Sequence, residues 1–484
     1  MKEKINLSTL LREGQLPEMA KIKFFQRCIK NSSFYVNLQG KNADNRKNTL
    51  HNMRIERNRY LKRLISSRWN GQIKIITGIR RCGKSYLLSV LYREYLIRDG
   101  VAPEQIISLE LDNDINVRYR NPMELGAYLR QMASDATKDY YILLDEIQMV
   151  EEIANPYLPK ESHSTISFVD VLLGLKSIQN VDVYVTGSNS KMLSSDVATA
   201  FRDRGEEIHI TPLTYDEFYA AYPDEKRFAW REFVAYGGMP FVLHKKTHEE
   251  KAKYLQDLFS LTYIRDVVER NRLRADTDTL DELLNVVASA VGSLTNPTRL
   301  ANTFQSVKGL KIKNETISTY LGCFIDAYIL CKAYRYDIKG RSYIDTPLKY
   351  YFTDIGLRNA RLNFRQQEEN HIMENILYNE LASRGFSIDV GVVEYNHTVS
   401  GKNIRTQLEV DFVVNRADKR YYIQSALTTA DEEKRQQEVN SLNRIDDSFA
   451  KIVVVGDNIM PWTDERGVQY INIEDFLLER INKL

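Results

Sequence analysis

Gly78-Ile79-Arg80-Arg81-Cys82-Gly83-Lys84-Ser85 fits the phosphate-loop pattern G-x-x-x-x-G-K-[ST] at every position. The apolar run 73–77 precedes it and predicts a buried strand, and the run 86–91 after it favours a helix. Glycines let the backbone bend tightly, so that consecutive N–H groups and the positive end of the next helix can face an anion. The stretch therefore predicts a nucleotide-binding loop; a glycine-rich turn that binds nothing is the alternative.

Side chains of this loop have predicted roles in binding ATP and Mg²⁺. Lys84 would reach the β- and γ-phosphates, and the Ser85 hydroxyl would complete the shell of a Mg²⁺ ion that keeps most of its waters. The residues expected to hold the nucleotide are Gly78, Ile79, Arg80, Arg81, Cys82, Gly83, Lys84, Ser85 and Tyr86.

The composition is typical of a soluble globular protein with several domains. The chain has 484 residues, of which 43% are apolar and 27% charged, and this length predicts roughly three domains. The formal net charge is only +2. Any affinity for nucleic acid must therefore come from local basic patches and not from the field of the whole molecule.

Cysteine usage and hydropathy predict a cytoplasmic protein. The 4 cysteines are too few and too scattered for a disulfide framework or a CxxC metal site. The N-terminus lacks the apolar core of a signal peptide, and no apolar run is long enough to cross a membrane. We expect no membrane partner.

From residue 73 onward, short apolar runs alternate with helical patterns, which is typical of an α/β fold with a parallel sheet. Strands are expected at 105–111 and 140–145, with a helix at 122–133 between them. The second of these strands ends in Asp145-Glu146. A carboxylate at this place beside a phosphate loop can hold the waters of Mg²⁺, and an adjacent glutamate can polarise the attacking water. A solvent-facing strand end is the alternative for Asp145 and Glu146.

The next segments carry further candidates for the nucleotide site. An exposed insertion at 147–170 leads to a helix at 168–176 and a strand at 181–187, which runs into Ser188-Asn189-Ser190. Polar side chains at a strand tip can sense the γ-phosphate or hold the lytic water, and we favour Asn189 over Ser188. A turn with side-chain to backbone hydrogen bonds is the alternative.

Two arginines precede the next predicted strand, at 207–211. Arg204, and less so Arg202, could neutralise charge in the transition state, either within the chain or across a subunit boundary. The alternative is that both are ordinary surface residues.

The segments GIRRCGKS, YYILLDE, VTGSNSKMLS and FRDRGEEIHITPLTYDEF, in this order, resemble the archaeal-type AAA ATPases, which carry a C-terminal PD-(D/E)xK-like domain. The resemblance covers roughly 53–460. It implies a P-loop core of the ASCE/AAA type with five strands and a catalytic Glu146 next to the strand that ends at Asp145. Family members tend to have glycine between the two arginines, where this chain has Asp203.

The resemblance also implies the domain order. We expect an N-terminal extension at 1–52, a P-loop ATPase core at 53–220, a helical lid at 221–278, a winged helix at 279–360 and a degenerate PD-(D/E)xK-like domain at 361–484. The lid would contain Tyr236-Gly-Gly-Met-Pro240 and a long helix from Glu249.

The winged helix is the candidate site for double-stranded DNA. Three helical patterns (280–291, 298–304 and 314–326, with Asn314 as a cap) precede two strand-like runs that flank a basic loop. Winged helices also serve protein contacts. The residues that could face phosphates are Lys308, Lys311, Lys313, Lys339 and Arg341.

In PD-(D/E)xK nucleases, a carboxylate on a helix, an aspartate on one strand and a Glu-x-Lys on the next gather a metal ion and its water. Glu374 and Asp411 match the first two, but Gln424-Ser425-Ala426 stands where Glu-x-Lys should be. Glutamine adds no charge and alanine cannot orient water. We therefore expect little or no cleavage.

The leading hypothesis is an AAA-type ATPase that couples ATP hydrolysis to rearrangement of its C-terminal domains and associates with nucleic acid. One alternative is a slow nucleotide-gated signalling switch that binds a protein partner. Another is an ATP-assisted, metal-dependent nuclease. The expected partners are ATP, double-stranded DNA and further copies of the chain.

Overall fold

The structure is a computed structural model that describes residues 53–187, 204–264, 267–268, 277–309, 311–365, 368–399, 402–429 and 431–484. Residues 54–484 form one compact unit. The predicted extension 1–52 and the candidates Asn189 and Arg202 lie outside the described residues. None of the described helices is long and apolar enough to span a lipid bilayer.

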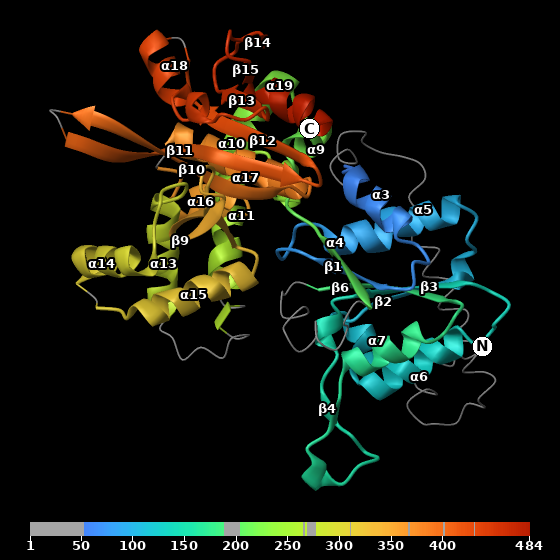
Figure 1. The fold of residues 1–484 in the computed structure, drawn as a ribbon. Coiled ribbons are helices and arrows are strands. Elements are labelled where there is room, and N and C mark those ends of the chain that lie inside the picture. The colour runs from blue at the N-terminus through green and yellow to red at the C-terminus, as the bar shows by residue number, and fades with distance from the viewer. Residues whose placement is uncertain are drawn as a thin grey trace, which may run out of the picture. The chain divides into compact units, whose positions relative to one another are not determined.

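A five-stranded parallel sheet forms the centre of the N-terminal half (Figure 1). Its strand order is β2-β3-β6-β1-β7, and every neighbouring pair is parallel. The strands are β1 (Ile73–Thr77), β2 (Ile106–Glu110), β3 (Tyr140–Asp145), β6 (Val181–Thr186) and β7 (Gly205–His209). The α/β prediction and the predicted strands are confirmed, because continuous apolar runs suit a sheet that is covered on both faces.

Helices cover both faces of this sheet, as Figure 1 shows. One face carries α3 (Asn58–Ser66), α4 (Lys84–Tyr86) and α5 (Arg93–Arg98), and the other carries α6 (Pro122–Met132) and α7 (Phe168–Lys176). Short helical turns lie at η2 (Pro103–Gln105), η3 (Asp114–Arg120), η4 (Ile147–Met149) and η5 (Lys160–Ser162). The α6 helix begins where expected because Asn121 caps it and Pro122 occupies its first turn.

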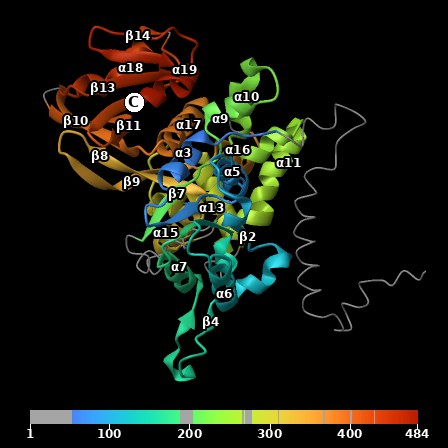
Figure 2. The same ribbon diagram turned by 90° about the vertical axis from the view of Figure 1, so that its right-hand side faces the viewer.

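The insertion at 147–170 contains a short hairpin that sequence analysis did not predict. Its strands, β4 (Ile153–Ala154) and β5 (Thr165–Ile166), are antiparallel. Figures 1 and 2 both show this hairpin projecting away from the five-stranded sheet. Only two residues pair on each strand, which is too short a run to give a periodic signal.

Helical segments follow the sheet. The first group is α9 (Tyr215–Ala221), η7 (Lys226–Phe228), α10 (Ala229–Tyr236), η8 (Pro240–His244), α11 (His248–Leu258) and η9 (Phe259–Tyr263). The second is α13 (Thr277–Ser289), α14 (Pro297–Lys308) and α15 (Asn314–Asp326). The three helices of the second group lie where sequence analysis expected them. The predicted Asn314 cap is wrong: Asn314 is the first residue of α15, and its amide donates to Thr298 Oγ1 at 3.0 Å.

A mixed eight-stranded sheet with the order β14-β15-β13-β12-β11-β10-β8-β9 forms the C-terminal part. Its strands are β8 (Leu330–Asp337), β9 (Ser342–Phe352), β10 (Ser387–Val399), β11 (Lys402–Arg416), β12 (Lys419–Ala426), β13 (Ala450–Val455), β14 (Trp462–Thr463) and β15 (Val468–Asn472). The associated helices are α16 (Ile355–Arg361), α17 (Glu369–Ser383), α18 (Glu432–Val439), η10 (Leu442–Arg444), α19 (Ile473–Leu478) and η11 (Arg480–Lys483).

This sheet crosses the expected domain boundary between residues 360 and 361. The hairpin of the expected wing, β8 and β9, forms around the turn at Lys339–Arg341. However, β8 also pairs in parallel with β10, so that Arg335 lies opposite Val390. Backbone hydrogen bonds therefore tie the expected wing to the strands that follow it, and the winged helix stays a prediction.

Candidate nucleotide-binding site

The phosphate loop leaves the carboxyl end of β1 and enters a continuous helical run made of α4, the π-helical turn η1 (Leu87–Tyr92) and α5. Gly78 and Gly83 have φ values of 141° and 100°, which only glycine adopts readily. A Cβ atom on Gly78 would lie 2.1 Å from the Ile210 carbonyl oxygen. The glycine at this position is thus needed for close contact with the segment that follows β7.

The loop offers both buried and exposed groups to a ligand. Its buried residues are Gly78, Ile79, Cys82 and Lys84; Gly83 and Tyr86 are half-buried; and Arg80, Arg81 and Ser85 are exposed. The Lys84 ammonium donates to the carbonyl oxygens of Gly78 and Ile79 at 3.0 and 3.1 Å. These acceptors are neutral, so an anionic phosphate could replace them as a stronger partner.

Ser85 and Asp145 meet at this edge of the sheet. The Asp145 carboxylate accepts a hydrogen bond from the Thr186 hydroxyl, and the Ser85 hydroxyl lies near the same carboxylate. Burial raises the pKa of Asp145, and the hydroxyl groups of Thr186 and Ser85 oppose the rise. Carboxylate and hydroxyl oxygens are the ligands that Mg²⁺ prefers, so the residues present fit this ion.

Thr186 is a site residue that sequence analysis missed. It ends β6, the strand between β1 and β3, and its hydroxyl also accepts a hydrogen bond from the Glu146 backbone N–H at 3.0 Å. The available signal was its position, because the carboxyl ends of neighbouring parallel strands meet at one edge. The structure brings Thr186, Ser85, Asp145 and Glu146 together.

Glu146 has an unusual backbone conformation. Its φ and ψ values are 53° and 51°, in the left-handed region, and its carboxylate accepts a hydrogen bond from the Gln148 side-chain amide. Residues held in this region by their surroundings concentrate at functional sites. The left-handed turn keeps Glu146 beside Asp145 at the same edge of the sheet.

Arg204 lies at the opposite edge. Its carbonyl oxygen accepts a hydrogen bond from the Ile73 N–H at 2.9 Å, so that it sits at the amino end of β7, whereas the phosphate loop leaves the carboxyl end of β1. The expectation that Arg204 acts within its own chain is therefore wrong for this arrangement, because the length of the parallel strands separates the two sites. Action across a subunit boundary stays a prediction.

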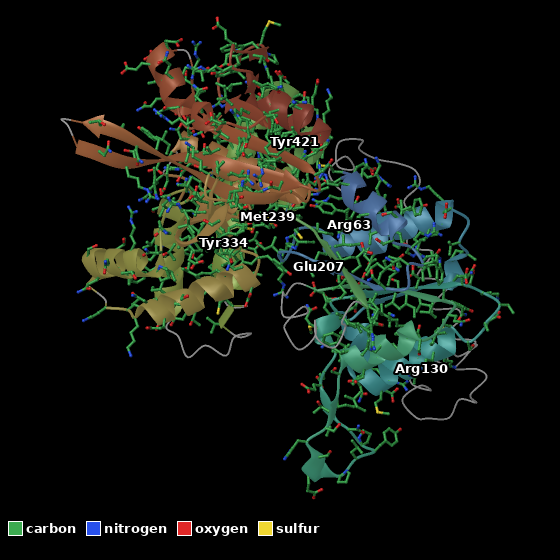
Figure 3. All side chains as sticks on the ribbon, in the orientation of Figure 1. Arg63, Arg130, Glu207, Met239, Tyr334 and Tyr421 are labelled. Carbon is green, nitrogen blue, oxygen red and sulfur yellow. The ribbon has the colours of Figure 1, made fainter. Side chains whose placement is uncertain are left out.

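Two tyrosines from later segments reach the loop region, and neither carried a sequence signal. Tyr263 in η9 donates its hydroxyl hydrogen to the Arg80 carbonyl oxygen at 3.1 Å. Tyr328, after α15, places its ring 4.6 Å from the ring of His209. Burial and the nearby Lys84 ammonium lower the pKa of His209 to about 4, so this histidine is neutral at pH 7. Figure 3 labels Glu207, two residues before His209.

The chain matches two families along its length. Residues 70–219, which contain the five-stranded sheet, match a family described as an AAA domain. Residues 227–368 match a domain of unknown function.

Two relatives are similar over most of their length. An uncharacterised protein of Haemophilus influenzae is 30% identical over 430 residues, covering 88% of this chain and 99% of the relative. The uncharacterised protein MJ1544 of Methanocaldococcus jannaschii is 26% identical over 422 residues, covering 84% of this chain and 85% of the relative.

Solved structures give weaker matches. A Walker-type ATPase of Pyrococcus abyssi has 14% identity and a TM-score of 0.43, covering 64% of this chain and 96% of that one. The Orc1 protein of Aeropyrum pernix, solved in complex with DNA, has 14% identity and a TM-score of 0.27, covering 64% of this chain and 92% of that one.

Proposed function

The chain belongs to the archaeal-type AAA ATPase family, and from this premise we propose that it binds and hydrolyses ATP and couples the nucleotide state to a rearrangement of its C-terminal segments. The observation that carries this proposal is that the Ser85 hydroxyl lies close enough to the Asp145 carboxylate to oppose the rise in its pKa that burial causes. This proximity joins a phosphate loop to the carboxylate of a different strand, which is the pairing that a nucleotide with its divalent cation requires.

Each residue of the site has a proposed role. Backbone N–H groups of the loop from Gly78 to Tyr86 hold the phosphates, and Lys84 exchanges its carbonyl partners for phosphate oxygens. Ser85 and Asp145 would hold Mg²⁺, which supplies positive charge to the phosphates when it is bound. Glu146 orients the attacking water and accepts its proton.

Two further roles belong to this proposal. Asn189 senses the γ-phosphate from the tip that follows β6. Arg204 stabilises transition-state charge at the site of a neighbouring copy, which suits its exposed position at the far edge of the sheet. Homo-oligomer formation is therefore part of the proposed mechanism.

A chain of contacts supports coupling between the loop and the C-terminal segments. We call residues 210–215, which follow β7, the exit segment. At its start the Ile210 carbonyl packs against Gly78. Further on, the Leu213 N–H donates to the Gly238 carbonyl at 2.7 Å, and the Tyr215 N–H donates to Glu380 Oε1 of α17 at 2.5 Å.

Asp354 extends this chain of contacts. Its carboxylate accepts from the Gly238 N–H at 2.6 Å and from the Leu357 N–H at 3.0 Å, the latter in the first turn of α16. If a bound nucleotide shifts the phosphate loop, the loop pushes on the exit segment. Hydrogen bonds link that segment to α17 directly and to α16 through Gly238 and Asp354. We propose that this is the route of coupling.

The expected domain order is retained as a proposal: core at 53–220, helical lid at 221–278, winged helix at 279–360 and PD-(D/E)xK-like domain at 361–484, the last two sharing one sheet. Duplex DNA is the proposed partner of the winged helix. The exposed positions of Lys311, Lys313, Lys339 and Arg341 support this assignment. The segment just before α15 and the β8–β9 turn would both contact phosphates.

ATP binding and turnover of Glu146→Gln test the enzymatic part of the proposal. The glutamine of this variant can still accept the hydrogen bond from Gln148, so the variant should bind ATP as the unmodified protein does. It cannot accept a proton from water. Turnover should fall by about 10²–10⁴-fold. Glu151→Gln, an exposed position nearby, is the matched control. Unchanged turnover in Glu146→Gln would remove Glu146 from the mechanism.

Turnover measured with and without duplex DNA tests the partner. Stimulation that declines with salt and is reduced by a combined Lys339→Ala and Arg341→Ala change supports DNA association. Slow turnover that DNA leaves unchanged supports instead a nucleotide-gated switch with a protein partner.

A further inference from the structure

One lysine and three carboxylates meet in the C-terminal sheet, away from the phosphate loop. Lys349 Nζ lies 2.7 Å from Glu374 Oε1, 2.6 Å from Glu409 Oε1 and 3.9 Å from Asp411 Oδ1. Lys349 comes from β9, Glu374 from α17, and Glu409 and Asp411 from β11. Four side chains from three elements thus form one cluster, which we call the Lys349 cluster.

Three members of the Lys349 cluster are closed to solvent, whereas the side chain of Glu409 is 34% exposed. Lys349, Glu374 and Asp411 have exposed fractions of 3%, 7% and 8%. Tyr351, two residues after Lys349 on β9, donates its hydroxyl hydrogen to Glu374 Oε1 at 2.6 Å. A Cβ atom on Gly292 would lie 3.1 Å from Glu374 Oε2, so the turn after α13 packs directly against this carboxylate.

Two of these carboxylates are the ones that match a metal-dependent nuclease. The neighbouring strand does not supply the rest of such a centre. Gln424 accepts a hydrogen bond from the Asp411 backbone N–H at 3.3 Å and donates to Glu438 at 3.4 Å. Ala426 is 1% exposed and packs in an apolar cluster with Tyr422. No cationic or acidic group is therefore available from these two positions.

We infer that the ammonium group of Lys349 is the permanent cation of this cluster and takes the place of a divalent metal ion. An ammonium group has three N–H donors, and the carboxylate oxygens of Glu374 and Glu409 lie within hydrogen-bonding distance of it. A divalent metal ion would need the same oxygen atoms as ligands. Its bonds to oxygen are shorter than the hydrogen bonds from the ammonium nitrogen to these oxygens, so the metal ion would have to occupy the space that the ammonium group fills. The two cations therefore exclude each other.

The consequence is that two features prevent metal-dependent cleavage at the C-terminal sheet: the Glu-x-Lys of the motif is missing, and the Lys349 ammonium group occupies the metal position. Loss of the motif lysine at position 426 is accompanied by a lysine from β9 that neutralises the remaining acids. The Lys349 cluster then serves to join β9, β11 and α17 rather than to bind a phosphodiester. This inference does not depend on ATP hydrolysis at the phosphate loop.

Mn²⁺ binding to the full chain without nucleotide tests the inference, with bound Mn²⁺ counted by electron paramagnetic resonance. The unmodified protein and the Asp411→Asn variant should bind the same amount of Mn²⁺, because no Mn²⁺ is bound at Asp411. Lys349→Met, which keeps most of the side-chain volume but not the charge, should gain one Mn²⁺ per chain. Adding Asp411→Asn to Lys349→Met should abolish that gain.

Lys251→Met is the matched control, because Lys251 is also buried but pairs with the single carboxylate of Glu232. It should gain no Mn²⁺. Asp411-dependent Mn²⁺ binding by the unmodified protein would overturn the inference, and so would a folded Lys349→Met that gains none.

A measurement on the unmodified protein covers the case in which Lys349→Met fails to fold. Amine acetylation followed by mass spectrometry should leave Lys349 unmodified while exposed lysines such as Lys138 react, and Mn²⁺ should not change this. Acetylation of Lys349 that increases when Mn²⁺ is added would show displacement of the ammonium group by the metal and would overturn the inference.

Discussion

Lys84 in the phosphate loop and Lys349 in the C-terminal sheet are equally buried, each with an exposed fraction of 3%. The partners of the two ammonium groups differ. Lys84 donates to two backbone carbonyl oxygens, whereas Lys349 pairs with the carboxylates of Glu374 and Glu409. One lysine is held by neutral dipoles and the other by negative charges.

This difference separates a lysine that can bind a ligand from one that holds the fold together. Hydrogen bonds to charged acceptors are about twice as strong as those to neutral ones. Lys84 can therefore leave its carbonyl partners for a phosphate at little cost. Lys349 cannot leave without exposing buried carboxylates to each other. Burial alone does not distinguish the two roles; the charge of the acceptors does.

The largest expected effect is on catalysis by Lys84→Met. Turnover should fall by about 10³-fold, since the γ-phosphate loses a preorganised positive donor, and ATP binding should weaken strongly. Stability should fall less than in Lys349→Met, because the carbonyls of Gly78 and Ile79 that lose a donor are neutral. ATPase assays together with urea unfolding measure both quantities. Lys138→Met, at an exposed position, is the control, and a large loss of stability in Lys84→Met would break the contrast with Lys349.

The next largest effect is on stability in Lys349→Met. Removing one partner of a buried ion pair leaves uncompensated charge and costs about 3–5 kcal/mol. The free energy of unfolding from urea titration measures this cost. Adding Glu374→Gln to Lys349→Met should recover part of the loss, because one unpaired carboxylate is then removed. A Lys349→Met variant as stable as the unmodified protein would contradict the role assigned to this lysine.

The sequence indicated which segments of the phosphate-loop region come together, because they follow the carboxyl ends of strands in one parallel sheet. Parallel strands bring their carboxyl ends to one edge, so that a motif after β1 and an acidic pair after β3 must meet. Thr186 was missed because a threonine at a strand end carries no motif. The prediction that Arg204 acts within its own chain was wrong, because Arg204 lies at the amino end of β7 and the phosphate loop lies at the carboxyl end of β1.

The C-terminal site could be predicted only in part. Glu374 and Asp411 were found from a helix and a strand of the expected type, and Gln424 and Ala426 were identified as departures. Lys349 was not found, because its strand was assigned to a separate wing. Its contact with Glu374 depends on how β9 packs against α17, and side-chain periodicity along either element does not specify that packing.

A smaller effect concerns Asp354, which links the exit segment to α16. Burial raises the pKa of Asp354 to about 6, although hydrogen bonds from Gly238 and Leu357 oppose the rise. The folded state therefore holds this proton more tightly than the unfolded state, and the stability so gained is present below pH 4 and lost as pH rises through 6. Relative to Asp354→Asn, the unmodified protein should lose about 2 kcal/mol between pH 4 and pH 7.

Urea unfolding of both proteins at several pH values measures this difference, with Asp139→Asn at an exposed position as control. A difference that is constant across this range would mean that Asp354 titrates normally.

The smallest expected effects are at two histidines that report on the two lysines. Burial and the Lys84 ammonium lower the pKa of His209 to about 4. The Glu374 carboxylate, 3.9 Å from His371 Nδ1, raises the pKa of His371, against the opposing effects of burial and Lys349. Each lysine therefore lowers the pKa of its own histidine, and removal of either charge should raise the pKa of that histidine alone.

Nuclear magnetic resonance titration of the imidazole C–H signals can test this in the full chain, which has 7 histidines; His209→Gln and His371→Gln assign the two signals. Lys84→Met should raise the pKa of His209 and leave that of His371 unchanged, and Lys349→Met should do the reverse. ATP with Mg²⁺ distinguishes the lysines further, because the Lys84 ammonium then gains phosphate partners that favour a positive charge nearby. The pKa of His209 should rise on nucleotide binding while that of His371 stays constant, as expected if only the lysine held by neutral carbonyls exchanges its partners.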